Sequence, residues 1–283
     1  MTGGRYYMAG NIADSFRNDG KPVVMGILNV TPDSFSDGGK YNKLDAALKH
    51  VQEMINDGAD IIDVGGESTR PGFTFIEPVE EMSRVCPVIE KIKENFDIPI
   101  SLDTYKPSVA WAGVEAGADM INDIWGLKWH KDDFKYSMAE VAAVKEAGVI
   151  IMHNRETAEY EELIRDCIKD LEHSIALAEA GGVAAENIIL DPGIGFAKDT
   201  EQNLIVMNNL EKICALGYPV LLGTSRKSMI GNTLNLPKDE REEGTIATSV
   251  MGLMKGCRIF RVHDVKKNRR ALDMTYAIMN SGK

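Results

Sequence analysis

Residues 23–39 read Val-Val-Met-Gly-Ile-Leu-Asn-Val-Thr-Pro-Asp-Ser-Phe-Ser-Asp-Gly-Gly, and this stretch decides the fold. Its first six residues form an apolar run rich in β-branched side chains, which is typical of a strand buried on both faces. The run ends at Asn29 and opens into a polar loop longer than the roughly 2–6 residues of most strand-to-helix connections. An ordinary connection of turn-forming residues is the alternative. A carboxamide at a strand end, followed by a long polar loop, favours instead the catalytic rim of an α/β enzyme.

The same plan repeats along the chain at a period of about 35 residues. Glycines stand just before most of the strand candidates, where a left-handed residue ends the preceding helix. Eight strands are expected, at 23–28, 60–64, 99–102, 119–122, 149–152, 187–190, 219–222 and 257–260.

Amphipathic segments fill the intervals between these strands. Pro78 and Pro107 stand where a first helical turn should begin, and the pair Asp199 and Gln202 resembles a capping box. Apolar residues recur at helical spacing in three segments: Leu44, Leu48, Val51 and Ile55; Val79, Met82, Val85, Ile89 and Ile92; Leu204, Met207, Leu210 and Cys214.

Eight strands alternating with eight helices predict a single (β/α)₈ TIM barrel, with long βα loops 1 and 2 at its C-terminal rim. A doubly wound open sheet is the alternative, but it would usually carry a GxGxxG turn, and the sequence has none. We expect residues 1–20 to form an N-terminal extension packed on the barrel and residues 21–283 to form the barrel domain.

The composition of the chain limits the kinds of partner that it can bind. The 283 residues carry a formal net charge of −11 and a mean hydropathy of −0.19, so the chain as a whole repels nucleic acid and anionic membranes. An anionic substrate therefore needs a local basic cluster. The sequence has no apolar run long enough to cross a membrane and no signal-peptide core near its start. Its four cysteines are widely spaced, and these features together predict a cytoplasmic protein.

A polar group stands at the end of every expected strand. Each one alone could cap a helix or fix its loop, but helix caps do not require Lys, Arg or His. In barrels the C-terminal ends of the strands meet at one rim, where active sites lie. The groups in chain order are Asn29, the 65–70 loop, Asp103, Asn122, His153 with Asn154, Asp191, the 223–228 loop, and Arg261 with His263.

Asp103, Asn122 and Asp191 directly follow buried apolar strands. An unpartnered charge there would cost several kcal/mol or more. Pairing with a neighbouring Lys or Arg is one solution. A ligand that presents a fork of N–H donors, such as an aminopyrimidine ring, is the other.

The loops after the last two expected strands carry positively charged side chains. Ser228 falls near the start of a helix, where free N–H groups favour an anion, and Lys227 adds a positive charge. Arg261 and His263 suit a phosphate or pyrophosphate, because barrels often bind phosphate near strands 7 and 8. His263 as a core histidine is the alternative. Asn29 offers one oxygen to a Mg²⁺ ion that would bridge to the phosphate.

Seven segments together resemble the dihydropteroate synthase family, in that family's order and across roughly residues 21 to 275. They are 28–39 (LNVTPDSFSDGG), 63–72 (DVGGESTRPG), 101–106 (SLDTYK), 122–124 (NDI), 191–196 (DPGIGF), 223–228 (GTSRKS) and 261–264 (RVHD). The first two are specific to this family, whereas Asp103, Asn122 and Asp191 are shared with the wider pterin-binding barrels. Two departures are minor: Ala197 stands where many members have Gly, and Asn154 follows His153 where others have Met.

The resemblance implies a transferase of folate biosynthesis. It would condense 6-hydroxymethyl-7,8-dihydropterin pyrophosphate with 4-aminobenzoate to give 7,8-dihydropteroate and pyrophosphate, with sulfonamides as competitive inhibitors and a homodimer as the assembly. The aniline nitrogen attacks after pyrophosphate leaves, so no protein nucleophile is needed, in agreement with a sequence that lacks Ser-His-Asp and Cys-His arrangements.

The resemblance also implies residue roles. The pterin would be held by Asp103, Asn122, Ile124, Met152, Asp191, Phe196, Gly223 and Lys227. The pyrophosphate would be held by Asn29, Arg70, Arg261 and His263, with Mg²⁺ on Asn29. The aminobenzoate would be held by Phe35, Thr69, Pro71, Lys227 and Ser228, and the catalytic set would be Asp33, Lys227, Arg261 and His263.

Two other functions compete with this one. A corrinoid-linked methyltransferase of the pterin-binding superfamily would have no use for the Arg261 and His263 pair, and a non-catalytic pterin-binding barrel would be expected to have lost Asn29, Lys227 or Arg261. All of these residues are present. We also expect the two early loops to close over the site, so that aminobenzoate binds productively only after the pterin pyrophosphate.

Overall fold

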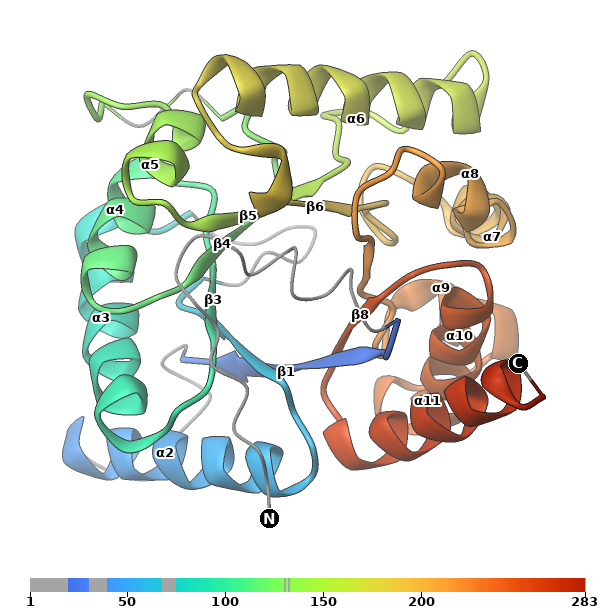
Figure 1. The fold of residues 1–283 in the computed structure, drawn as a ribbon, viewed down its shortest axis with the longest axis horizontal. Helices are drawn as coiled ribbons and strands as arrows, with labels where there is room; N and C mark the ends of the chain where they lie inside the picture. The colour runs from blue at the N-terminus through green and yellow to red at the C-terminus, as the bar shows by residue number, and fades with distance from the viewer. Residues whose placement is uncertain (1–19, 31–39, 68–74, 130, 132, 283) are drawn as a thin grey trace.

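Eight parallel strands form one sheet in the computed structural model, which describes residues 20–30, 40–67, 75–129, 131 and 133–282. The strands follow the order β6-β5-β4-β3-β2-β1-β8-β7, and helices surround them as a ring (Figure 1). Their bounds are β1 Val23–Asn29, β2 Ile61–Gly65, β3 Ile100–Asp103, β4 Met120–Asp123, β5 Gly148–Met152, β6 Ile188–Asp191, β7 Leu221–Leu222 and β8 Ile259–Val262.

The sheet closes on itself between β6 and β7. A single parallel bridge joins Leu190 to Val220, and the Leu190 N–H donates to the Pro219 carbonyl at 2.9 Å. The single TIM barrel is therefore confirmed, and the open doubly wound sheet is wrong. Nearly all the expected strands are displaced toward the C-terminus by one or two residues at one or both ends, so Asp103, Asp191 and Arg261 lie within strands rather than after them.

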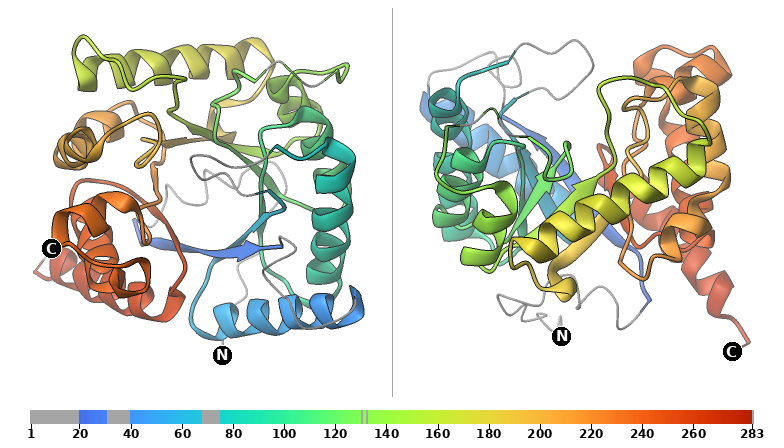
Figure 2. Two further views of the ribbon diagram at one scale, coloured as in Figure 1. Left: turned by 180° about the vertical axis from the view of Figure 1, so that it is seen from behind. Right: turned by 90° about the horizontal axis from the view of Figure 1, so that it is seen from above.

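Helices cover the outside of the sheet, as the views from behind and from above show (Figure 2). In the described part of the chain, two connections hold a pair of α-helices where one was expected: α7 and α8 between β6 and β7, and α9 and α10 between β7 and β8. The bounds are α2 Lys40–Asn56, α3 Pro78–Asn95, α4 Pro107–Glu115, α5 Met138–Val144, α6 Leu163–Ala180, α7 Thr200–Asn208, α8 Leu210–Cys214, α9 Ser228–Leu234, α10 Glu242–Met254 and α11 Val265–Asn280.

The predicted helix starts are confirmed, whereas two residues predicted to lie on the apolar faces of helices are not buried. Pro78 and Pro107 each open their helix, and Asp199 with Gln202 forms a capping box at the start of α7. Val79 and Leu204 were expected on apolar faces but are exposed. The apolar series that began with Leu204 was predicted to follow one helix. It is divided between two helices because Asn209, at φ −121° and ψ 20°, leaves the helical region between α7 and α8.

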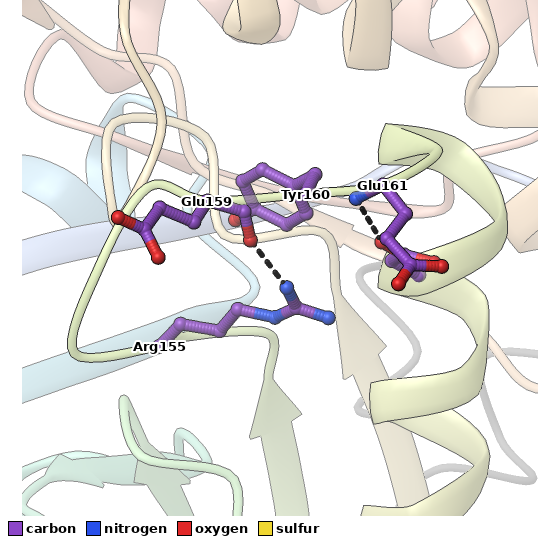
Figure 3. A pocket seen from close by; sticks show the side chains of 5 residues that line it. Arg155, Glu159, Tyr160 and Glu161 are labelled. Carbon is purple, nitrogen blue, oxygen red and sulfur yellow. Dashed lines mark hydrogen bonds between the residues drawn. The ribbon is translucent and has the colours of Figure 1, made fainter.

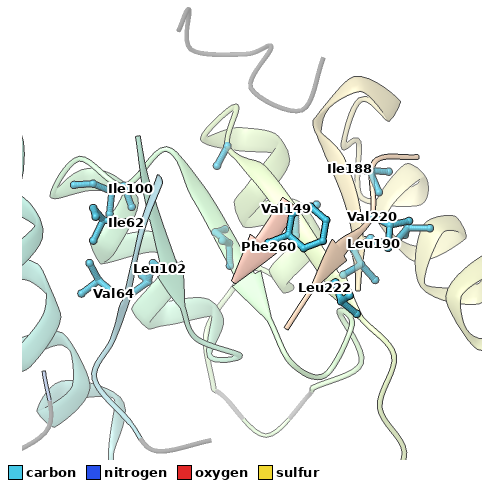
Figure 4. Packing of buried hydrophobic residues seen from close by; sticks show 14 of the residues in the cluster. Ile62, Val64, Ile100, Leu102, Val149, Ile188, Leu190, Val220, Leu222 and Phe260 are labelled. Atoms are coloured by element: carbon cyan, nitrogen blue, oxygen red, sulfur yellow. The ribbon is translucent and has the colours of Figure 1, made fainter. Parts of the chain in front are cut away.

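The strands bury apolar side chains on both faces. Outward-pointing residues such as Ile62, Leu190 and Phe260 pack between the strands and the helices (Figure 4). A second set fills the inside of the barrel: Val23, Met25, Ile61, Met120, Ile150, Ile189, Leu221 and Ile259. Side chains alternate between the two faces of a strand, so the inward residue two positions later lies above this filling, at the C-terminal mouth.

Candidate active site

The predicted polar residues lie in one layer at the mouth of the barrel. In the sheet register Asn29 is the partner of Gly65, Gly65 of Asp103, and Asp103 of Asn122. Across the barrel, Met152 is the partner of Asp191. Two positions before Asn122, Met152 and Asp191 stand Met120, Ile150 and Ile189 of the apolar filling, so the layer has an apolar floor on these three strands.

A buried ion-pair cluster crosses this layer from β8. The Arg261 guanidinium donates from Nε to Asp63 Oδ2 at 2.6 Å and from Nη2 to Asp103 Oδ2 at 2.7 Å. Asp63 is fully buried on β2. The two buried carboxylates neutralise the half-buried arginine, and Arg261 in turn partners one oxygen of Asp103.

The other oxygen of Asp103 has no partner in the part of the chain that the structure describes. Its Oδ1 is buried and receives no hydrogen bond from the described residues. Burial raises the pKa of Asp103 to about 7, although the Arg261 charge acts in the opposite direction. Because an unsatisfied buried oxygen costs about 1–3 kcal/mol, this atom is suited to a donor that arrives with a ligand.

Asp191 is held differently. Its Oδ1 accepts the Gly193 N–H at 2.7 Å, which fixes the carboxylate at the end of β6. Burial raises its pKa, and the Lys227 charge lowers it. A methyl group added at Gly223 would lie 3.9 Å from both Asp191 Oδ2 and Arg261 Cβ, so the glycine keeps space open between these two residues.

Apolar side chains form the wall of the mouth. Ile124 and Met152, both predicted, pack with Tyr105 in one buried cluster, and the predicted Phe196 lies against it. Trp125 and Trp129 border the same cluster and Tyr105 meets Trp129 with ring centroids 4.7 Å apart.

The positive side of the mouth comes from β7 and β8. The Lys227 ammonium lies 4.7 Å from the centroid of the Phe196 ring and donates to the Ile194 carbonyl, and burial lowers its pKa to about 8. His263 is half-buried, so it is not a core histidine, and its Nδ1 lies 2.9 Å from Ser225 Oγ. Ser228 is exposed at the first position of α9.

Asn29 supplies a single candidate oxygen for a metal. Its Oδ1 would lie 3.8 Å from a methyl group added at Gly65, beside Asp103. Among the described residues, no three His, Cys, Asp or Glu side chains are grouped as a metal site. One amide oxygen fits Mg²⁺ only in the mode in which water and substrate phosphates supply the remaining ligands.

Comparison with known proteins identifies the family. The model of the family described as "Pterin binding enzyme" matches residues 25–263. The dihydropteroate synthase of Clostridium beijerinckii is 61% identical, over 92% of this chain and 95% of its own length. The chain belongs to the dihydropteroate synthase family.

Two solved structures agree with this assignment. The dihydropteroate synthase of Clostridium difficile, determined in the presence of pteroic acid, is 50% identical and superposes with a TM-score of 0.87, over 91% of this chain and 97% of that one. The Yersinia pestis enzyme in a sulfonamide drug complex is 41% identical with a TM-score of 0.83, over 92% of this chain and 95% of that one.

Several residues that lie at the mouth were not predicted from the sequence. Asp63 is the most consequential, because it holds Arg261. The sequence does contain a signal for Asp63, since a carboxylate inside the apolar run 61–64 must have a buried partner. Tyr105, Trp125 and Trp129 gave no comparable signal, because aromatic residues after strands are usually ordinary core.

Five of the predicted residues lie outside the described residues: Asp33, Phe35, Thr69, Arg70 and Pro71. The expected closure of the two early loops also falls there. Residues 1–19 of the expected N-terminal extension do as well.

A separate hollow lies on the segment between β5 and α6 (Figure 3). Its volume is about 420 Å³, and it is lined by Arg155, Glu159, Tyr160, Glu161 and Asp166. Arg155 donates to the Glu159 carbonyl at 2.6 Å, and the Glu161 N–H donates to Asp166 at 2.8 Å (Figure 3). None of the predicted substrate residues lines it.

Proposed function

We propose that the barrel mouth binds a dihydropterin pyrophosphate and condenses it with 4-aminobenzoate, giving 7,8-dihydropteroate and pyrophosphate. Asp103, Asn122 and Asp191 would accept and donate hydrogen bonds at the edge of the pterin ring. The observation that carries this assignment is the buried Oδ1 of Asp103, which has no hydrogen-bond partner among the described residues and which an N–H donor of the ring would satisfy.

The faces of the ring would contact apolar side chains. Ile124 and Met152 provide a buried surface, and Phe196 borders it. Lys227 would donate to the ring carbonyl, and it already lies above the edge of this surface, 4.7 Å from the Phe196 centroid. Gly223 leaves room for the ring beside Asp191.

The pyrophosphate would lie toward β8 and β1. A guanidinium has five N–H donors, and the two bonds that Arg261 makes to Asp63 and Asp103 leave others for an anion. His263 follows it on the same strand end, and Arg70 would join them. Asn29 would hold Mg²⁺ with one oxygen, and the ion would neutralise charge on the leaving group.

The reaction needs no nucleophile from the chain. The C–O bond to pyrophosphate breaks, the electron-rich pterin carries the resulting positive charge, and the aniline nitrogen then forms the new C–N bond and loses a proton. Arg261 and His263 favour the departure by stabilising negative charge as it develops. Lys227 orients the ring, and Asp33 is assigned a catalytic role by family resemblance alone.

The aminobenzoate would meet the pterin at the outer edge of the mouth. Ser228 and Lys227 would receive its carboxylate, and Phe35, Thr69 and Pro71 would flank its ring. Sulfonamides resemble aminobenzoate in shape and charge and would compete for this position.

The decisive experiment mixes the purified chain with Mg²⁺, dihydropterin pyrophosphate and 4-aminobenzoate and measures pyrophosphate release and dihydropteroate. We expect both products in equal amounts, and neither when aminobenzoate is omitted. Binding of pterin without turnover would indicate the non-catalytic barrel. Methyl transfer from a methylated pterin to a corrinoid would indicate the methyltransferase.

We infer a homodimer that forms through α10 and α11. These helices pack side by side (Figure 1) and expose Met251, Met254, Met274 and Ile278, an apolar set that is typical of an interface. Sedimentation should give twice the chain mass, and Met254→Lys should shift it to the monomer. An unchanged dimer in the variant would place the interface elsewhere.

We infer the cytoplasm as the compartment. All four cysteines are free thiols, as in reducing compartments. Among the helices of the described ranges, none is long and apolar enough to cross a membrane. Fractionation of the cells of origin would test this inference, and recovery in a secreted fraction would contradict it.

A further inference from the structure

A buried network centred on Lys198 ties the β5–α6 segment to the β6–α7 loop. Lys198, the last residue before the cap of α7, is buried, and its ammonium faces three acceptors. These are His153 Nδ1 at 2.8 Å, the Gly193 carbonyl at 3.1 Å and the Phe196 carbonyl at 3.1 Å. An ammonium has three protons, so every donor of Lys198 is used, two of them on the loop.

The network continues through His153 to α6. Because Lys198 donates to Nδ1, that nitrogen is unprotonated, and Nε2 carries the proton that it donates to Asp170 Oδ2 at 3.0 Å. Arg155 donates to the same oxygen at 2.6 Å. Burial lowers the pKa of His153 to about 4, so the imidazole is neutral at neutral pH and can accept from an ammonium.

A second group holds the same loop from the hollow described above. The Tyr160 hydroxyl donates to the Ala197 carbonyl at 2.7 Å, and the Arg155 guanidinium lies 4.5 Å from the centroid of the Tyr160 ring. Ala197 has a positive φ of 44°, a conformation that an alanine adopts only when its surroundings impose it.

The held carbonyls lie next to the atoms that would bind pterin. Phe196 itself carries one of them, and Gly193 donates its N–H to Asp191 Oδ1 at 2.7 Å. A methyl group added at Gly193 would come within 1.9 Å of the His153 carbonyl, so the two segments are also in close backbone contact.

We propose that Lys198, oriented by His153 and Asp170, is a positioning residue for pterin recognition that fixes the backbone of 193–197 and thereby aims Asp191 and Phe196 at the ring. The inference rests on the proposed function, in which those two residues contact the pterin. Lys198 does not touch substrate. Its role is to hold two loop carbonyls with hydrogen bonds from one buried cation, whose third bond goes to His153.

The test compares Lys198→Met with Lys128→Met. Lys128 is a matched control because its ammonium also donates to a loop carbonyl, that of Asn154 at 2.8 Å, and burial lowers its pKa as it does that of Lys198. The Lys128 bond, however, does not reach the β6–α7 loop. Steady-state kcat and the KM of each substrate are measured for both variants, with melting curves.

We expect Lys198→Met to raise the KM of the pterin pyrophosphate about tenfold or more and to leave the KM of aminobenzoate within about twofold. Lys198→Arg, which keeps the charge, should recover part of the loss, and Lys128→Met should leave both KM values near those of the wild type. Equal rises in both KM values, or a lower melting temperature with neither KM changed, would overturn the proposal.

Tyr160→Phe covers the case in which Lys198→Met fails to fold. This half-buried side chain loses only its bond to the Ala197 carbonyl, so we expect a rise of about two- to fivefold in the pterin KM alone. No change would contradict the inference. If the wild-type chain makes no dihydropteroate, the proposed function itself is refuted. Failure of the proposed function can therefore be distinguished from failure of the role proposed for Lys198.

Discussion

At the scale of single residues, two carboxylates at the mouth of the barrel differ in their hydrogen-bond partners. Asp103 shares Arg261 with Asp63, and its other oxygen is unpaired within the described ranges, whereas Asp191 accepts the backbone N–H of Gly193. Pairing with an arginine, the alternative that the sequence left open, therefore applies to half of the Asp103 carboxylate.

Asp191→Ala should reduce kcat/KM for the pterin substrate by about 30- to 1000-fold. It removes a charge-assisted hydrogen bond worth about 2–4 kcal/mol. The fold should survive, because the carboxylate faces the mouth rather than the core. Steady-state kinetics and a melting curve check both statements, and kinetics like those of the wild type would remove Asp191 from the site.

Arg261→Ala should lower the free energy of unfolding by about 3–5 kcal/mol, because it leaves Asp63 and Asp103 buried without their cation. Urea denaturation measures this loss. Arg165→Ala is the control, since Arg165 is itself exposed in its ion pairs with Glu161, Glu162 and Asp166, and its loss should cost at most about 1 kcal/mol.

The same variant tests the anion assignment. Calorimetric titration should show that Arg261→Ala weakens the binding of the pyrophosphate ester more than the binding of the bare pterin. Equal losses for both ligands would assign Arg261 to the ring or to the fold alone.

At the scale of elements, the segment after β5 and the loop after β6 act as one unit through His153. Its pKa of about 4 lies below the ordinary value of 6.5, so the folded protein binds this proton less readily than the unfolded chain does. The stability that depends on neutral His153 is fully present above about pH 6.5 and is lost as the pH falls toward 4. The loss approaches about 3 kcal/mol.

The difference in unfolding free energy between the wild type and His153→Gln should therefore shrink as the pH falls from 6.5 to 4. The charged groups that face His153 are Asp170, Lys198 and Lys128, and all three are retained in the variant. Asp103 acts in the opposite direction between about pH 4 and 7, because its pKa is raised, and it cancels in the difference. A difference that does not vary with pH would show that His153 is not held neutral by the fold.

At the scale of the whole molecule, the barrel has one weak seam. β6 and β7 meet through a single bridge at Leu190 and Val220, whereas β1 pairs along its length with β2 and β8. Regions with few backbone hydrogen bonds open at lower free energy. Native-state hydrogen exchange should therefore release the Leu190 amide before the amides of β1, and equal protection would mean that the seam is as stable as the rest.

The sequence by itself determined the eight strands, their succession along the chain and the polar layer at their ends. Apolar runs and glycine stops are local signals, and a period of two along a strand already places Asn122 above Met120 and Asp191 above Ile189. Helix starts at Pro78, Pro107 and Asp199 were readable for the same reason, since capping involves neighbours in sequence.

Only the tertiary structure decided which polar groups meet. Arg261 binds Asp63, which lies 198 positions away in the chain, and Lys198 reaches His153 across 45 positions. Partners this distant leave no pattern in a single sequence, because any buried charge needs some partner but does not specify which. Closure between β6 and β7 was likewise set by the packing of the whole ring, since an open sheet and a barrel share the same local strand signals.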